Sequence, residues 1–134
     1  MAVARQNNSR VASVESAAIA FVQPGGEVSS PSRSRPIDLV HLARQTLGDR
    51  ALEAEVLALF SRQASGVASR IGQVTGKERG LLAHSLKGSA RSIGAFRVAE
   101  LAEKIEADPA SEKAVAALYD ALTDVQEFIA AISR

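Results

Sequence analysis

The chain has 134 residues, 46% of them hydrophobic and 4% aromatic, with no cysteine and a formal net charge of +1 at pH 7. This length suits one domain with an aliphatic core, and the small net charge argues against a nucleic-acid binder, which normally carries a large basic excess. Because no run approaches the roughly 18 apolar residues of a membrane span and the lack of cysteine fits a reducing compartment, we expect a cytoplasmic protein that binds neither nucleic acid nor membrane.

Residues 1–35 differ in composition from the rest of the chain. Residues 11–22 are fairly apolar, but Ser13, Glu15 and Ser16 interrupt the apolar core that a signal peptide requires. Proline, glycine and serine then dominate up to position 36, and such a segment cannot bury enough apolar surface to become ordered. We therefore expect a flexible N-terminal arm over residues 1–35 and a folded domain over residues 36–134. A short helix over residues 12–20, docked on the domain or on a partner, is the alternative.

Capping residues and apolar periodicity predict helices throughout the folded domain. Three helices should begin at the capping residues Asp38, Asp49 and Ser111. Gly94 allows a break between two further helices. The expected helices run from Asp38 to about Thr46, from Asp49 to near Gln73, from about Lys77 to Ile93, from about Phe96 to the stop at Asp108 and Pro109, and from Ser111 through Ile132.

Four longer helices joined by short turns predict an all-α fold, an antiparallel four-helix bundle with an additional short N-terminal helix over one end. The core should be aliphatic, with Phe60, Phe96 and Phe128 as its large pieces. His41, in the short first helix, is interpreted as a surface or boundary residue without a functional role.

The helix expected over residues 77–93 places a histidine opposite its apolar face. At about 100° per residue, the apolar arc consists of Leu82, Leu86, Ala90 and Ile93. His84 points the other way, and on its side of the helix lie Lys77, Gly80, Lys87, Gly88 and Arg91. A glycine inside an exposed helix costs roughly 1 kcal/mol relative to alanine, so the two glycines one turn from His84 need a reason. One such reason is that glycines leave room for a bulky group to reach the imidazole.

Three kinds of chemistry would use such a histidine. A metal site needs further ligands, and the only other histidine, His41, is far away in sequence. General acid–base catalysis needs a second catalytic group, and this face offers only cations. The third is nucleophilic: one ring nitrogen accepts a phosphoryl group while a hydrogen bond holds the other, and Lys87 and Arg91 offset the phosphate charge. A lone histidine on a polar helix face is most often only solvated, but the joint spacing of histidine, lysine and glycine favours the phosphate acceptor.

One stretch, Gly72-Gln-Val-Thr-Gly76-Lys77-Glu78, partly matches a nucleotide-binding P-loop. It fails because the glycine spacing is one residue short, glutamate stands where serine or threonine should hold magnesium, and no strand precedes it. Without a nucleotide site the chain has no evident means of taking phosphate from ATP. We therefore expect a carrier and not an enzyme, with no cofactor or metal ion bound by the chain itself.

The segment His84-x-Leu86-Lys87-Gly88-Ser89-x-x-x-Ile93-Gly94 resembles the signature of histidine phosphotransfer (Hpt) domains, the intermediate carriers of multistep phosphorelays. The resemblance covers about residues 36–134. It implies that His84 is the phosphoacceptor, that Lys87 lies beside the phosphate and that Gly88 gives access. It also implies a polar residue on the next helix that orients the ring. Glu106 occupies that position, where some members have glutamine, and Glu103 is the alternative.

The same resemblance implies the partners. A receiver domain of a hybrid histidine kinase would donate the phosphoryl group from an aspartate, with magnesium bound in that receiver, and the receiver of a response regulator would accept it. Docking needs an apolar patch near His84, for which Leu81 is the candidate, flanked by Gly80 and Lys77, although Leu81 could equally be a core residue at the bundle edge. Arg91 is a candidate contact for phosphate or partner. We expect a monomer. The competing hypothesis is a non-catalytic helical docking or inhibitory module that binds a receiver or kinase without carrying phosphate.

Overall fold

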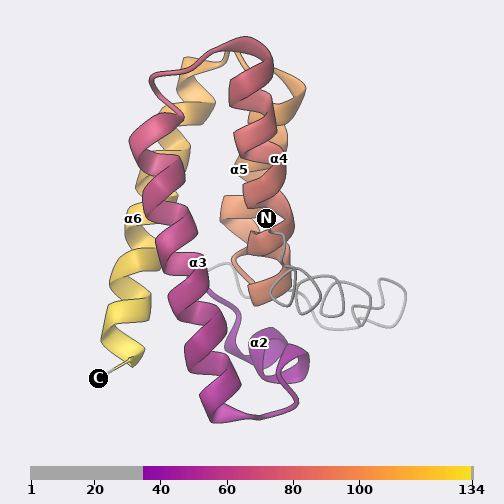
Figure 1. The fold of residues 1–134 in the computed structure, drawn as a ribbon, viewed down its shortest axis with the longest axis vertical. Coiled ribbons are helices and arrows are strands. Elements are labelled where there is room, and N and C mark those ends of the chain that lie inside the picture. The colour runs from indigo at the N-terminus through magenta and orange to yellow at the C-terminus, as the bar shows by residue number, and fades with distance from the viewer. Residues whose placement is uncertain (1–34, 134) are drawn as a thin grey trace.

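The structure, a computed structural model, describes residues 35–133, and these residues form α-helices joined by turns and short irregular segments. The all-helical prediction is thereby confirmed (Figure 1). The helices are α2 (Leu39–Gln45), α3 (Arg50–Arg70), α4 (Gly76–Ile93), α5 (Phe96–Ala107) and α6 (Glu112–Ile132). Apart from Arg35, the predicted N-terminal arm lies outside the described residues, as does the alternative helix over residues 12–20.

Side chains cap three helices at the predicted residues. The carboxylates of Asp38 and Asp49 and the hydroxyl of Ser111 each accept a hydrogen bond from the backbone N–H three residues later. These bonds satisfy donors that the first turn of a helix otherwise leaves unpaired. The predicted helix ends agree to within about three residues, the largest difference being α3, which ends at Arg70 instead of near Gln73.

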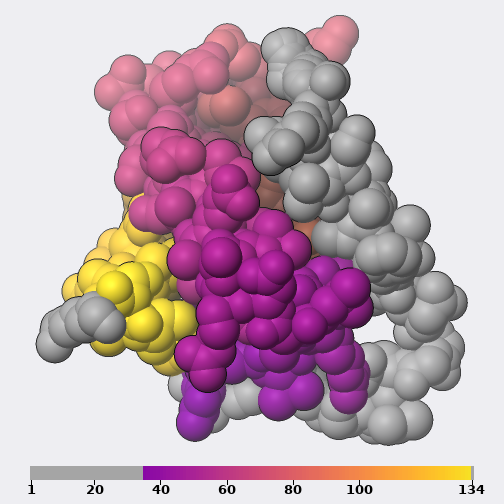
Figure 2. Space-filling view, turned by 60° about the horizontal axis from the view of Figure 1, so that its bottom comes forward, coloured from indigo at the N-terminus to yellow at the C-terminus, as the bar shows by residue number. Residues whose placement is uncertain are grey.

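The four longer helices lie alongside one another, with α3 and α6 on one side of the view in Figure 1 and α4 and α5 on the other. The short α2 lies at the bottom, and from that end Figure 2 shows α2 and the start of α3 in front, with the yellow end of α6 beside α3. The side chain of Gln126 in α6 bonds Ser61 and Ser65 in α3. Helix α4 packs against α3, α5 and α2, so three elements surround the predicted histidine helix.

The core is aliphatic, as the composition predicts. Phe60 is fully buried, whereas Phe96 and Phe128 are only partly buried. In α4 the inward face consists of Ala83, Leu86, Ala90 and Ile93, with Leu82 at its edge. The predicted apolar arc is therefore shifted slightly, because Ala83 lies deeper than Leu82.

His41, which the sequence analysis interprets as a surface or boundary residue, is in fact buried, with 9% of its surface exposed. Helix α2 lies at the end of the bundle and packs against α4, and its His41 side chain extends to the start of α5. There the imidazole meets the ring of Phe96 edge-on, at a centroid distance of 5.1 Å.

Arg79 in the first turns of α4 is 2% exposed, and sequence reasoning did not single it out. Its guanidinium donates to the carbonyls of Ile71 (2.9 Å) and Pro109 (2.8 Å) and to the carboxylate of Glu112 (3.1 Å). It therefore ties the end of α3, the turn after α5 and the start of α6 to α4. A buried arginine is tolerated because its donors meet acceptors in this way.

Candidate functional site

His84 lies in the middle of α4 on its solvent face. Its side chain is 64% exposed, while the adjacent Ala83 and the nearby Leu86 are completely buried. Because these two residues fix the inward face of the helix, the imidazole must point outward.

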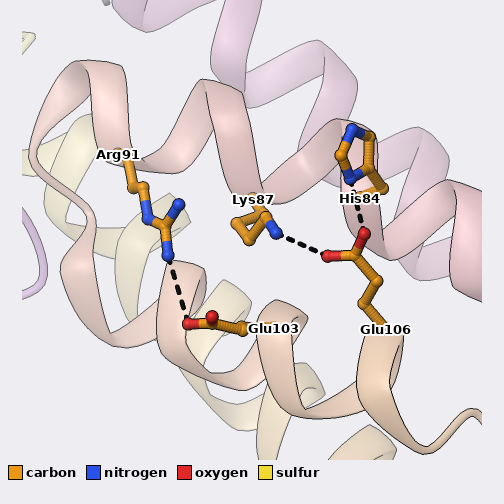
Figure 3. Close-up of polar contacts among 5 residues, drawn as sticks. All are labelled: His84, Lys87, Arg91, Glu103 and Glu106. Atoms are coloured by element: carbon orange, nitrogen blue, oxygen red, sulfur yellow. Dashed lines mark hydrogen bonds and ion pairs between the residues drawn. The ribbon is translucent and has the colours of Figure 1, made fainter.

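One carboxylate joins His84 to Lys87 (Figure 3). Glu106, in the last turn of α5, places Oε2 at 2.6 Å from Nδ1 of His84 and accepts a hydrogen bond of 2.6 Å from Nζ of Lys87 on Oε1. Lys87 lies one turn after His84 in α4, and its side chain is only 17% exposed. The histidine and the lysine are thus held by a single residue from the neighbouring helix.

This contact determines which ring nitrogen is available. An ionised carboxylate only accepts hydrogen bonds, so Nδ1 of His84 must carry the proton that it shares with Glu106. In the neutral ring the lone pair then lies on Nε2, the nitrogen that Figure 3 shows pointing away from Glu106. The geometry therefore presents a nucleophilic nitrogen to solvent.

The pKa of the Glu106 carboxyl is lowered, which favours this contact. The hydrogen bond from Lys87, and after it the one from His84, hold the pKa of the Glu106 carboxyl below its usual range. The group therefore remains ionised at neutral pH and can act as the acceptor that the neutral ring requires.

The other predicted ring partner, Glu103, lies elsewhere. It accepts a hydrogen bond of 3.1 Å from Arg91, one turn further along α4 than Lys87. Since a helix rises about 1.5 Å per residue, Arg91 is about 10 Å along the axis from His84. Of the two glutamates, the structure brings only Glu106 to the ring. The predicted cationic stripe is also less basic than the sequence suggests, because α5 places a glutamate beside Lys87 and another beside Arg91.

The remaining predicted residues lie on α4 before and after His84. Beyond the backbone of α4 itself, a methyl group on Gly88 would meet no atom within 4 Å, and one on Gly80 would meet the Pro109 ring at 3.7 Å. Leu81 is 59% exposed, so the structure does not place it in the core. Lys77 is exposed in the first turn of α4.

Sequence reasoning missed what α3 contributes to this face. The amide of Gln63 in α3 donates a hydrogen bond of 3.3 Å to the hydroxyl of Ser85, the residue after His84. No local pattern relates positions 63 and 85, which meet only because α3 and α4 pack together.

Comparison with known proteins gives one match. The family model described as Hpt domain matches residues 38–128, which include α2 to α5 and most of α6. The chain belongs to the Hpt domain family. Hpt domains are phosphocarriers that transfer phosphoryl groups on histidine in phosphorelays and interact with receiver domains. No curated protein and no solved structure matches the chain.

The described part of the chain, residues 35–133, offers neither a metal-binding cluster nor a membrane-spanning helix. That part of the chain holds no group of three or more histidine, aspartate or glutamate side chains placed to bind a metal ion. Over the same residues, none of the helices combines the length and the apolar character needed to cross a membrane.

Proposed function

We propose that His84 is the phosphoacceptor of this Hpt domain. In the proposed relay, His84 takes a phosphoryl group from an aspartate in the receiver domain of a hybrid histidine kinase and passes it to an aspartate in the receiver of a response regulator. The observation that carries the proposal is the contact between Nδ1 of His84 and Glu106, because in the neutral ring it places the lone pair on Nε2 of an exposed side chain.

The transfer step follows from this arrangement. The Nε2 lone pair attacks the phosphorus of the aspartyl phosphate, an N–P bond forms, and the P–O bond to the aspartate breaks with its electron pair leaving on the carboxylate. The ring, still protonated on Nδ1, becomes positively charged, and the charge of Glu106 then balances it. Before the transfer, Glu106 balances the charge of Lys87. After it, Lys87 can offset the charge of the phosphoryl group, which is the role that the resemblance implies.

The rest of the chemistry comes from the partner. The receiver domain supplies the aspartate and a bound magnesium ion, and this chain supplies a nucleophile held in one tautomer, so it acts as a carrier. As part of the proposal, the domain is an antiparallel four-helix bundle with an additional N-terminal helix. Two observations support that topology. Short turns join successive helices, and α4 packs on α3 while α5 packs on α6. We further propose that it acts as a cytoplasmic monomer.

A labelling experiment tests the assignment. The full-length protein is incubated with magnesium and a panel of purified receiver domains that have been phosphorylated on aspartate. We expect phosphate on the wild-type protein that is labile in acid and stable in alkali, and none on His84→Gln, with the same helical content by circular dichroism. The matched control, Ala51→Gln, places the same new side chain at an exposed position near the start of α3 and should be labelled.

Two results would contradict the proposal. Labelling that persists in His84→Gln would place the acceptor at another residue. Binding of a phosphorylated receiver without labelling of the wild-type protein would instead favour the non-catalytic docking or inhibitory module.

A further inference from the structure

A small cavity lies between the start of α5 and the middle of α6. Its volume is about 90 Å³. Three buried apolar residues contribute to its lining, Val98 on α5 and Ala121 and Val125 on α6. Arg35 and Pro36, the first residues that the structure describes, line it as well. The cavity therefore lies where residues 1–34 join the domain.

The charged residues around this cavity are not engaged elsewhere. Arg35, Arg97 and Asp124 line it and are exposed, and within residues 35–133 none of the three forms an ion pair. Near His84, by contrast, glutamates neutralise both Lys87 and Arg91. An occupant that suits the cavity has an apolar side chain for the buried lining and an acidic residue for the two arginines.

Residues 11–22 of this chain have that character. The helix considered for residues 12–20, lengthened to residues 11–22, would carry most of its large apolar side chains on one face at about 100° per residue. That face consists of Val11, Val14, Ala18, Phe21 and Val22. Phe21 is the only aromatic residue before position 36, and Glu15 lies beside the face. The segment thus offers one large apolar side chain and one acid.

The connection between this segment and the domain is short. Twelve residues, 23–34, separate Val22 from Arg35, which itself lines the cavity. A chain of this length with glycine and serine has a mean end-to-end distance of about 20 Å, so the segment can return to the point where the domain begins. Such a tether gives an effective concentration in the millimolar range. A contact that is weak between separate molecules would therefore form within one chain.

We propose that residues 11–22 dock on the cavity between α5 and α6, with the ring of Phe21 against Val98 and Val125 and the carboxylate of Glu15 near Arg97. Arg97 lies nine residues before Glu106 on α5, which corresponds to about 14 Å along the helix axis. Docking at this end of α5 leaves the imidazole of His84 open. The inference therefore does not depend on the proposed function of His84.

Nuclear magnetic resonance of the full-length protein tests the contact. With Phe21 docked, we expect nuclear Overhauser contacts between its ring protons and the methyl groups of Val98 and Val125, and ring-current shifts of these methyl resonances. Because burial of one phenylalanine side chain favours the docked form by a factor of about ten or more, this form should account for about nine-tenths of the molecules. Phe21→Leu should remove the ring-current shifts, whereas the matched control in the connecting stretch, Val28→Leu, should retain them.

Each alternative result overturns the proposal in its own way. If the wild type shows no contact between Phe21 and the two valines, and Phe21→Leu leaves their methyl shifts unchanged, the segment does not occupy the cavity. If the contacts disappear on dilution, the segment of a second copy fills it instead. Equal shift changes in Val28→Leu would show that the effect is not specific to Phe21. Phe21→Leu should also accept phosphate on His84 as the wild type does, and a loss of labelling would contradict docking away from the imidazole.

Discussion

Gly94 ends the histidine helix in a conformation that a side chain would disturb. Its φ is +91°, in the left-handed region, and its carbonyl accepts a hydrogen bond of 3.0 Å from the N–H of Asp38, which begins α2. A methyl group added to Gly94 would stand 2.9 Å from the Asp38 carbonyl oxygen and 3.3 Å from its nitrogen. Gly94→Ala therefore strains the backbone and pushes α2 away from the end of α4.

The expected loss of stability is the sum of the backbone strain at residue 94 and the weakened hydrogen bond to Asp38. A left-handed backbone costs a residue with a Cβ about 1–2 kcal/mol, and weakening the hydrogen bond to Asp38 adds about 1 kcal/mol. The free energy of unfolding should therefore fall by about 2–3 kcal/mol. For a domain of about 100 residues, this lowers Tm by about 10–20 °C.

Urea and thermal unfolding of the full-length protein, followed by circular dichroism, measure both quantities. Gly66→Ala is the matched control, because Gly66 has an ordinary helical backbone and open space around it. It should raise the free energy of unfolding by up to about 1 kcal/mol. A loss below about 1 kcal/mol in Gly94→Ala, less than the backbone strain alone requires, would refute the reasoning, as would a destabilising Gly66→Ala.

Two further predictions concern buried and charged contacts. Arg79→Met leaves the carbonyls of Ile71 and Pro109 without their donor, and at about 1–3 kcal/mol for each unpaired group we expect about 2–6 kcal/mol of destabilisation. Urea unfolding measures it, and a loss below 1 kcal/mol would contradict it. Because Lys87 and His84 lower the pKa of Glu106, the stabilisation from its charge is present above the unfolded pKa, near 4.3, and is lost only as the pH falls through the lower folded value. The ¹³C resonance of its carboxyl carbon should therefore titrate with a midpoint below about 4.3 in the wild type, and a midpoint at or above that value would contradict the contact.

Local features of the chain could be predicted from the sequence because their causes are local. The caps at Asp38, Asp49 and Ser111 depend on a side chain and a backbone N–H three residues apart. The outward direction of His84 follows from the apolar residues on the other side of its own helix. Such features require only the period of a helix and the chemistry of one segment.

Features that need two segments could not be predicted in this way. In the sequence, Arg79 looks like one more surface cation of α4. It is buried because the turn after α5 and the start of α6 pack against it. His41 is buried because α2 packs against α4 at the end of the bundle. The pairing of Arg91 with Glu103 required the register between α4 and α5, which a single helix pattern does not contain.

The register between α4 and α5 links Gly94, at the end of the histidine motif, to His84 at its beginning. The turn at Gly94 and Ala95 reverses the chain so tightly that α5 returns directly alongside α4. His84 lies ten residues before Gly94 and Glu106 twelve residues after it, so the turn brings them to the same level of the helix pair. A longer turn, or one displaced by a residue, would present a different side of α5 to the ring, since successive helix positions differ by about 100°. The glycine at the end of the motif thus acts on the chemistry at its beginning, because it decides which carboxylate meets Nδ1 and hence which nitrogen of His84 faces solvent.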